Sequence, residues 1–326
     1  MTAFSATVLD LDPAAACSQI ESAIRRHVLE RLHRRGVVVG LSGGVDSSVV
    51  ATLCARALGQ DRVFALFMPE EESAPESLEL GTLVASDLGI ASTREDITPV
   101  LKAVGCYRRR DDAIRMVIPE FAEAWKSKLV ISGSGRFSFF KIVAESPEGV
   151  QKSARLTLPA YLGIVSANNF KQRTRKMFEY YHADRLNYAV AGTPNRLEYD
   201  QGFFVKGGDG SADLKPIAHL YKRQVYQVAQ WLGVPEKIRM RPPTTDTYSI
   251  TQSQEEFYFR FSYQTMDLCL YGKDHGIPAA EVALAVGLSR DEVELIYSEI
   301  DAKRHAARYL HQSPLLVENE EDRANS

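Results

Sequence analysis

Apolar residues in the first third of the chain alternate between short continuous runs and stretches with helical spacing. The runs at Val37 to Val39, Arg62 to Phe67 and Ile90 to Ile97 predict buried strands. Val49 to Leu58 and Pro75 to Leu88 carry apolar residues on one helical face, which predicts the helices between these strands. This alternation predicts an α/β fold with a doubly wound, mostly parallel sheet flanked by helices.

The remainder of the chain adds helices, one more strand and an insertion. Leu186 to Ala191 predicts another buried strand. Turn residues around Pro147 separate two β-like stretches, which predicts a β-hairpin inserted at about residues 133–162. The charged run Arg108 to Asp112 is interpreted as a solvent-exposed helix face. Further helices are predicted at Ala14 to Arg35, at Thr98 to Lys126 with a break near Gly105, at Asn168 to Arg185, at Pro216 to Leu232 and within Glu255 to His311.

These elements form one main domain with additions. We expect an N-terminal lead at residues 1–12 and the α/β domain, with its insertion, at residues 13–272. A helical C-terminal extension is expected at residues 273–317, followed by a disordered polar tail at residues 318–326.

Composition and charge narrow the choice of partners. The 326 residues are 45% hydrophobic and 25% charged, with a net charge of −3, so no basic field favours a nucleic-acid or membrane partner. The four cysteines have no Cys-x-x-Cys spacing, which favours reduced thiols over disulfides or a zinc site. The first residues have no leader pattern, and no apolar run is long enough to span a membrane, so we expect a cytoplasmic protein.

Candidate chemistry begins directly after the first predicted strand. Ser42 to Ser48 is a glycine-rich loop that leads into a helix, where backbone amides and the helix dipole favour an anion such as phosphate. The loop has no lysine, so it is not a Walker A loop. Its sequence resembles the pyrophosphate-binding loop of N-type ATP pyrophosphatases; the alternative is a turn that binds nothing. The resemblance implies that six residues hold the pyrophosphate of ATP: Ser42, Gly43, Gly44, Asp46, Ser47 and Ser48.

Several downstream motifs make the resemblance more specific. Gly192 to Glu198, Gly202 to Ile217, Leu220 to Val225, Leu232 to Pro235 and Pro242 to Asp246 together resemble the synthetase domain of the NAD+ synthase family. The similarity extends over roughly residues 14 to 270. The family uses ATP to adenylate the nicotinate carboxylate of deamido-NAD+, releasing pyrophosphate. Ammonia then attacks the acyl adenylate, giving NAD+ and AMP.

The resemblance also implies roles for individual residues. It implies catalytic roles for Asp46, Glu198 and Lys222, with Asp46 and Glu198 as ligands of Mg²⁺. Further ATP contacts are implied at Arg173, Thr193, Lys222 and Thr244, and Met68, at the end of the second predicted strand, is placed to flank the adenine. Acceptor contacts are implied at Phe203, Phe204, Lys206, Asp209 and Asp213. Asp246 is expected either to close over the site or to cap a helix.

Departures from the family pattern leave the acceptor open. The family's Gly-Thr-Gly-Asn reads Gly-Thr-Pro-Asn at Gly192 to Asn195, and Val205 to Asp209 also departs from the usual motif. The alternatives are an adenylating amide ligase that acts on another carboxylate, and a non-catalytic nucleotide-binding homologue. The chain carries no additional glutaminase domain, so we expect free ammonia or a separate glutaminase to supply the nitrogen. The family resemblance further implies a homodimer that shares the acceptor site.

Overall fold

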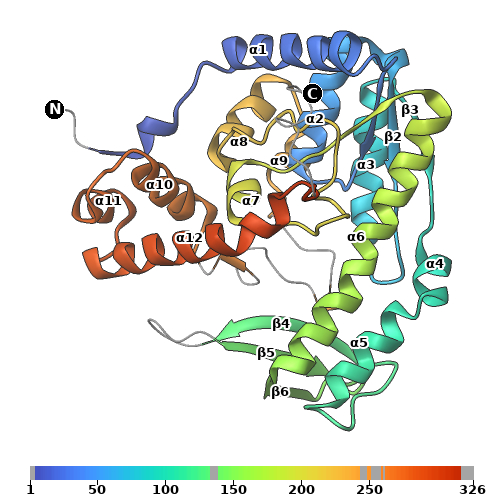
Figure 1. Cartoon of the computed structure of the whole chain (residues 1–326), viewed down its shortest axis with the longest axis vertical. Coiled ribbons are helices and arrows are strands. Elements are labelled where there is room, and N and C mark those ends of the chain that lie inside the picture. Colours follow the sequence, from blue (N-terminus) through green and yellow to red (C-terminus); the bar gives the residue numbers. More distant parts are fainter. Residues whose placement is uncertain (1–3, 133–138, 243–247, 251–257, 260, 317–326) are drawn as a thin grey trace.

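A four-stranded parallel sheet forms the centre of the computed structural model, which describes residues 4–132, 139–242, 248–250, 258–259 and 261–316 (Figure 1). Its strand order is β3–β2–β1–β7, and all neighbouring strands are parallel. The strands are β1 (Val37–Gly40), β2 (Val63–Phe67), β3 (Ala91–Arg94) and β7 (Ala189–Ala191). The predicted α/β fold is therefore confirmed, and all four predicted strands are present.

Helices cover both faces of this sheet. Val37 and Val39 of β1 pack into one core, whereas Val38 between them packs into the core on the opposite face. Because both faces are buried, the strand reads as a continuous apolar run. The first core includes residues of α1 (Pro13–Arg25), α2 (Val45–Leu58), α3 (Pro75–Asp87) and α8 (Lys222–Trp231). The second core includes residues of α4 (Thr98–Ala103), α5 (Cys106–Arg115) and α6 (Leu158–Leu186).

Several helix boundaries differ from the predicted ones. α1 continues as a π-helical segment, η2 (Arg26–Arg31). The helix therefore ends at Arg31 rather than at the predicted Arg35. α6 begins at Leu158 rather than Asn168, because the Thr157 hydroxyl caps its first turn by accepting a hydrogen bond from the Ala160 amide.

Two further helix predictions are wrong at one end. α5 ends at Arg115, and the chain has become a strand by Lys126, where the sequence predicted the end of a helix. α8 begins at Lys222 rather than Pro216, because the Tyr221 amide is capped by the Gln224 side chain at 3.0 Å.

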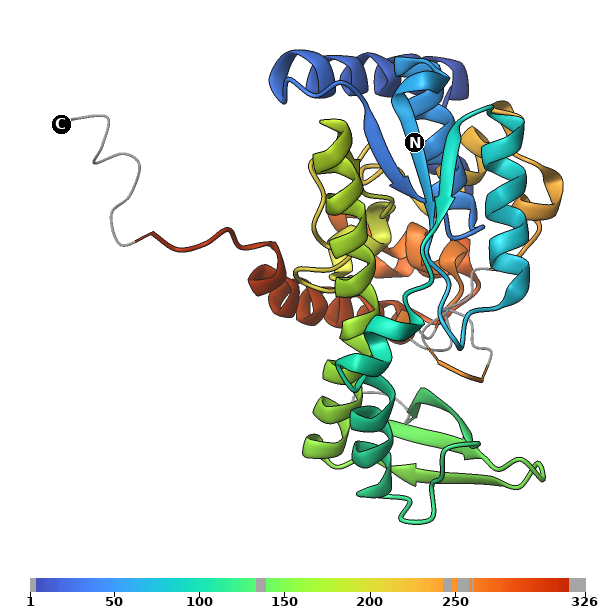
Figure 2. The same ribbon diagram turned by 90° about the vertical axis from the view of Figure 1, so that its right-hand side faces the viewer.

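The insertion is a separate antiparallel sheet. It consists of β4 (Lys126–Ser132), β5 (Phe139–Glu145) and β6 (Gln151–Arg155), so a third strand joins the predicted hairpin. Leu129 and Ile142 pack this sheet against α5 and α6. Figures 1 and 2 show it at the end of α6 that lies away from α1, so α6 joins the inserted sheet to the parallel sheet.

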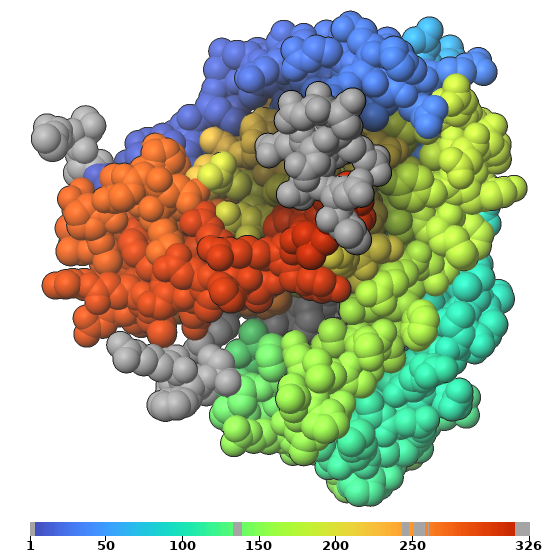
Figure 3. Space-filling model, viewed as in Figure 1, coloured from blue at the N-terminus to red at the C-terminus, as the bar shows by residue number. Residues whose placement is uncertain are grey.

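The C-terminal helices form a third layer around their own core. This core includes residues of α10 (Tyr263–Asp274), α11 (Ala279–Val286) and α12 (Arg290–His311). In Figure 3, α12 crosses the face of the molecule between α1 and the inserted sheet. The short helices α7 (Arg196–Gln201) and α9 (Glu236–Arg239) complete the described fold. The predicted tail at residues 318–326 lies outside the described residues. No described helix has the length and apolar character to cross a membrane.

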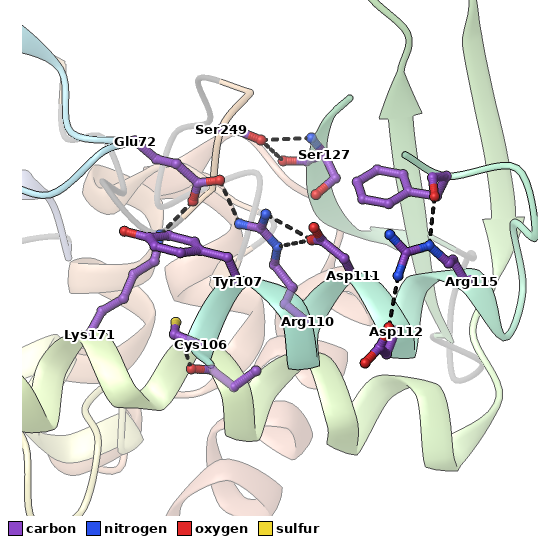
Figure 4. Close-up of polar contacts among 12 residues, drawn as sticks. Glu72, Cys106, Tyr107, Arg110, Asp111, Asp112, Arg115, Ser127, Lys171 and Ser249 are labelled. Carbon is purple, nitrogen blue, oxygen red and sulfur yellow. Dashed lines mark hydrogen bonds and ion pairs between the residues drawn. The ribbon is translucent and has the colours of Figure 1, made fainter. Parts of the chain in front are cut away.

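A buried ion-pair network fastens the loop after β2 to α5 and α6 (Figure 4). The Lys171 ammonium lies 2.8 Å from a Glu70 oxygen and 2.6 Å from a Glu72 oxygen. Arg110 also binds Glu72, at 2.5 Å, and pairs with Asp111. Burial would raise the pKa of Glu72, but Lys171 and Arg110 outweigh it and hold this pKa below its usual range. The exposed face predicted for Arg108 to Asp112 is wrong for Arg110 and Asp111, because both are buried in this network.

We expect Lys171→Met to destabilise the protein by about 3–5 kcal/mol, because it leaves the buried Glu70 carboxylate without its cation, whereas Glu72 keeps Arg110. Urea denaturation followed by circular dichroism measures this loss. Lys102→Met is the matched control, since Lys102 pairs with Glu71 in solvent and its loss should leave the unfolding midpoint unchanged. Equal shifts in the two variants would contradict a structural role for the buried network.

Candidate active site

A cavity of about 480 Å³ opens at the carboxyl ends of the parallel strands. Gly40 and Met68, at the ends of β1 and β2, line it, and so does Thr193, two residues after β7. Open parallel sheets bind ligands at this edge because loops from several strands meet there. Eleven of the predicted site residues line the cavity: Ser42, Gly44, Asp46, Ser47, Met68, Thr193, Glu198, Phe203, Phe204, Asp209 and Lys222.

The glycine-rich loop turns tightly into α2. Gly43 has a φ of +75°, and a Cβ there would lie 2.5 Å from the Ser77 carbonyl oxygen, so the turn requires glycine. α2 begins at Val45, four residues earlier than predicted, which places its N-terminal end at the cavity. The Ser48 hydroxyl donates to the Gly44 carbonyl at 2.8 Å and is buried, whereas Ser42 and Ser47 line the cavity. Ser48 therefore serves the loop's own structure.

Three charged side chains from three helices meet beside this loop. The Lys222 ammonium, at the start of α8, forms an ion pair with Asp46 of α2. Asn195, which caps α7, donates from its side-chain amide to the other Asp46 oxygen at 3.3 Å. Its backbone amide donates to Glu198 at 3.1 Å, and the Glu198 amide donates back to the Asn195 side chain at 3.1 Å. This reciprocal capping box fixes Glu198 close to Asp46.

The electrostatics of this cluster fit a bound divalent cation. Burial and the charge of Asp46 together raise the pKa of Glu198 to about 8. Burial acts to lower the pKa of Lys222, but Asp46 and Glu198 outweigh it and raise this pKa to about 12, so Lys222 stays charged. The buried Glu198 carboxylate and the partly buried Asp46 carboxylate thus share the Lys222 ammonium. Their hard oxygen donors fit Mg²⁺.

The donor set fits a cation that is bound together with phosphate. No group of three or more His, Cys, Asp or Glu side chains placed to hold a metal occurs among the residues that the structure describes. Mg²⁺ is commonly held by one or two carboxylates, with substrate phosphates and water as the remaining ligands. Asp46 and Glu198 would supply the protein ligands.

A carboxylate from α10 positions the start of α8. Asp267 is fully buried, and one of its oxygens accepts a hydrogen bond from the Arg223 amide at 2.9 Å, next to Lys222. Burial raises the pKa of Asp267 to about 7. The sequence motifs assigned no role to Asp267 or to Asn195. The Asn-x-x-Glu spacing could have revealed Asn195 as a helix cap, whereas Asp267 has no sequence signal because its contact is tertiary.

The predicted acceptor residues divide into two groups. Phe203, Phe204 and Asp209 line the cavity, and Asp209 accepts a hydrogen bond from the Val205 amide at 2.7 Å. Burial raises the pKa of Asp209 above its usual range.

Lys206 and Asp213 do not line this cavity. The Lys206 ammonium donates to the Tyr309 carbonyl at 2.8 Å, and Asp213 accepts a hydrogen bond from the Val190 amide at 2.7 Å. Both side chains therefore have structural partners, and their roles as acceptor contacts stay a prediction.

The remaining predicted ATP contacts are also divided. Arg173 is exposed and donates to the Lys206 carbonyl at 3.2 Å, whereas Arg175 lines the cavity and donates to the Met68 carbonyl at 3.3 Å. The family resemblance implied Arg173, and the sequence pattern alone does not show which of the two arginines faces the cavity. Thr244 and Asp246 lie outside the described residues.

Comparisons of the sequence with known proteins identify the relatives of this chain. A family model described as NAD synthase matches residues 16–123 and 149–309. The NH(3)-dependent NAD(+) synthetase of Mesorhizobium japonicum is 59% identical over 97% of this chain and 100% of its own length. The corresponding protein of Rhizobium rhizogenes is 56% identical, over 97% of this chain and 96% of its own length.

Solved structures share the fold at lower identity. The NH3-dependent NAD synthetase of Campylobacter jejuni has a TM-score of 0.62 at 24% identity, covering 94% of this chain and 100% of its own. The NMN synthetase of Francisella tularensis has a TM-score of 0.66 at 21% identity, covering 95% and 100%. The family model and the full-length relatives confirm the resemblance inferred from the motifs. The chain belongs to the NAD synthase family.

Proposed function

We propose that this protein is an ammonia-dependent NAD+ synthetase. It adenylates the nicotinate carboxylate of deamido-NAD+ with ATP and amidates it with ammonia, giving NAD+, AMP and pyrophosphate. The observation that carries this proposal is the cluster of Asp46, Glu198 and Lys222 beside the glycine-rich loop, in one cavity with Phe203 and Asp209. Relatives that are 55–59% identical to this chain are named NH(3)-dependent NAD(+) synthetases.

The first step requires positioning and charge neutralisation more than a protein nucleophile. A carboxylate oxygen of the acceptor forms a bond to the α-phosphorus as the bond to pyrophosphate breaks. The N-terminal amides and dipole of α2 face the phosphates, and Lys222 adds a fixed positive charge. Mg²⁺, held by Asp46 and Glu198, would neutralise phosphate charge when bound.

The second step forms the amide. Ammonia attacks the acyl carbon, the bond to AMP breaks, and the nitrogen loses a proton to water. Holding the acyl adenylate and excluding water favour this outcome over hydrolysis. Phe203, Phe204 and Asp209 lie on the wall where the acceptor would be held.

A direct assay tests this function. Purified protein with ATP, Mg²⁺, ammonium and deamido-NAD+ should release AMP and pyrophosphate and form NAD+ in equal amounts. Glutamine should replace ammonium only when a separate glutaminase is added. AMP release with a different carboxylic acid, and none with deamido-NAD+, would favour the alternative of another acceptor.

We also propose that the protein is a cytoplasmic homodimer. Four exposed apolar side chains lie on α6, and a second copy of the chain would cover them: Leu158, Leu162, Met177 and Tyr181. The four buried, unpaired cysteines suit a reducing compartment. Light scattering coupled to size-exclusion chromatography should give twice the chain mass.

A further inference from the structure

The inserted sheet forms one wall of the active-site cavity. Residues 124–148 lie outside the segments matched by the family model, and they contain β4 and β5. Phe140 of β5 lines the cavity together with Tyr161 from the first turn of α6. Their rings are stacked, with centroids 4.4 Å apart and planes 22° apart. The insertion thus presents an aromatic surface to the same cavity that contains the glycine-rich loop.

This wall is held in place from two sides. Leu129 and Ile142 anchor the inserted sheet in the core that it shares with α5 and α6. The Ser127 amide donates to the Ser249 hydroxyl at 2.8 Å, and this hydroxyl donates to the Ser127 carbonyl at 3.4 Å (Figure 4). The Ile250 amide also donates to the Ser127 carbonyl, at 3.2 Å. The aromatic pair therefore belongs to a fixed part of the protein rather than to a loose loop.

A poorly hydrogen-bonded amide lies on the same face of α6 as Tyr161, about two helical turns further along the chain. Asn168 of α6 lines the cavity and is only 4% exposed. The Tyr248 hydroxyl interacts with this side chain, yet among the described residues neither the amide oxygen nor the amide nitrogen has a partner in full hydrogen-bond geometry. A buried amide whose hydrogen bonds are not fully formed is costly. A ligand that offers one donor and one acceptor side by side would satisfy it.

We propose that Phe140, Tyr161 and Asn168 form a subsite for an adenine ring. Stacking on aromatic side chains holds the flat face of a base, and an asparagine amide pairs with adenine through an amino donor and a neighbouring ring nitrogen. A nicotinate ring offers acceptors only, so it would leave the amide oxygen unpaired. This inference rests on the proposed function, in which both ATP and deamido-NAD+ carry an adenine.

A matched pair of variants tests the aromatic surface. Phe140→Leu removes the ring but keeps apolar volume for packing. Phe139→Leu is the control, because Phe139 is the adjacent residue of β5, its ring lies near Lys141 and Arg155, and it does not line the cavity. We expect Phe140→Leu to raise the KM for one adenine-containing substrate by about 5- to 100-fold with little change in kcat. Phe139→Leu should behave as wild type.

The two KM values identify which adenine occupies the subsite. A rise in the KM for ATP assigns the subsite to ATP, and a rise in the KM for deamido-NAD+ assigns it to the dinucleotide. Asn168→Ala should raise the same KM as Phe140→Leu. It should also reduce the discrimination against the guanine analogue of that substrate by about tenfold.

Three outcomes would overturn this inference. They are unchanged KM values for both substrates in Phe140→Leu and Asn168→Ala, equal effects in Phe139→Leu, and undiminished base discrimination in Asn168→Ala. Wild-type turnover tests the proposed function separately. If the wild-type protein forms no NAD+, calorimetric titration of wild type and Phe140→Leu with ATP and with deamido-NAD+ still decides whether the subsite binds adenine.

Discussion

Replacing Asp46 with asparagine is expected to reduce adenylation by about 1000-fold or more. The change removes one of two carboxylates that would hold Mg²⁺, and it removes the counter-ion of Lys222, whose side chain is only 2% exposed. Fixed charges aimed at the reacting phosphate act in a site that excludes water, so the loss of one of them is large. AMP release in the presence of saturating ATP and deamido-NAD+ measures the effect.

Asp61→Asn is the control for this substitution. Asp61 is exposed in the short 3₁₀ helix η3 (Gln60–Arg62), so the same chemical change there should leave turnover unaltered. Thermal unfolding of both variants separates a loss of chemistry from a loss of fold. Full turnover by Asp46→Asn would show that Asp46 has no part in holding the cation.

Replacing Glu198 with glutamine is expected to lower turnover by about 100-fold while stabilising the protein without metal. The folded-state pKa of Glu198 is raised to about 8 by burial and by Asp46. The contribution of Glu198 to the free energy of unfolding is therefore fully present below its unfolded-state pKa. It is lost as the pH rises from about 4.5 to about 8. At about 1.4 kcal/mol per pKa unit, even a third of this shift would make the variant more stable by about 1.5 kcal/mol at pH 8.

Glutamine still has the carbonyl oxygen that accepts from the Asn195 amide, so the helix cap is retained. Denaturant unfolding in EDTA at pH 5 and pH 8 tests the stability effect, and the gain of the variant over wild type should appear only at the higher pH. Adding ATP and Mg²⁺ should raise the melting temperature of wild type more than that of the variant. A variant less stable than wild type at both pH values would contradict the electrostatic account.

The sequence predicted the centre of the fold because its strands are buried on both faces and thus read as unbroken apolar runs. The family resemblance, and no local pattern, paired Asp46 with Glu198, and the structure brings them together because loops after parallel strands meet at one edge. The sequence was wrong about the start of α8, since Pro216 suits a helix N-terminus and nothing local reveals that Tyr221 is the cap. Hydrophobic periodicity indicates which residues are buried. The residue at which a helix begins depends instead on single capping side chains, which the periodicity does not show.

The residues that sequence reasoning missed all reach the site through tertiary contacts. Arg175 and Asn168 lie on α6 among other polar residues, and only the packing of that helix decides which of them face the cavity. Phe140 belongs to an insertion whose position relative to the parallel strands no local pattern records. The geometry of the glycine-rich loop, by contrast, is determined by consecutive residues, so the sequence alone predicts it.

The pairing of β1 with β7 determines when the active site is completed during synthesis. Val37 pairs with Ala189, about 150 residues later, whereas β4, β5 and β6 are neighbours in sequence. The strands of the inserted sheet leave the ribosome before β7, so they can pair through local contacts while β1 still lacks one of its two flanking strands. Glu198 and Lys222 leave the exit tunnel later still, so a nascent chain whose inserted sheet has paired does not yet have a complete phosphate site.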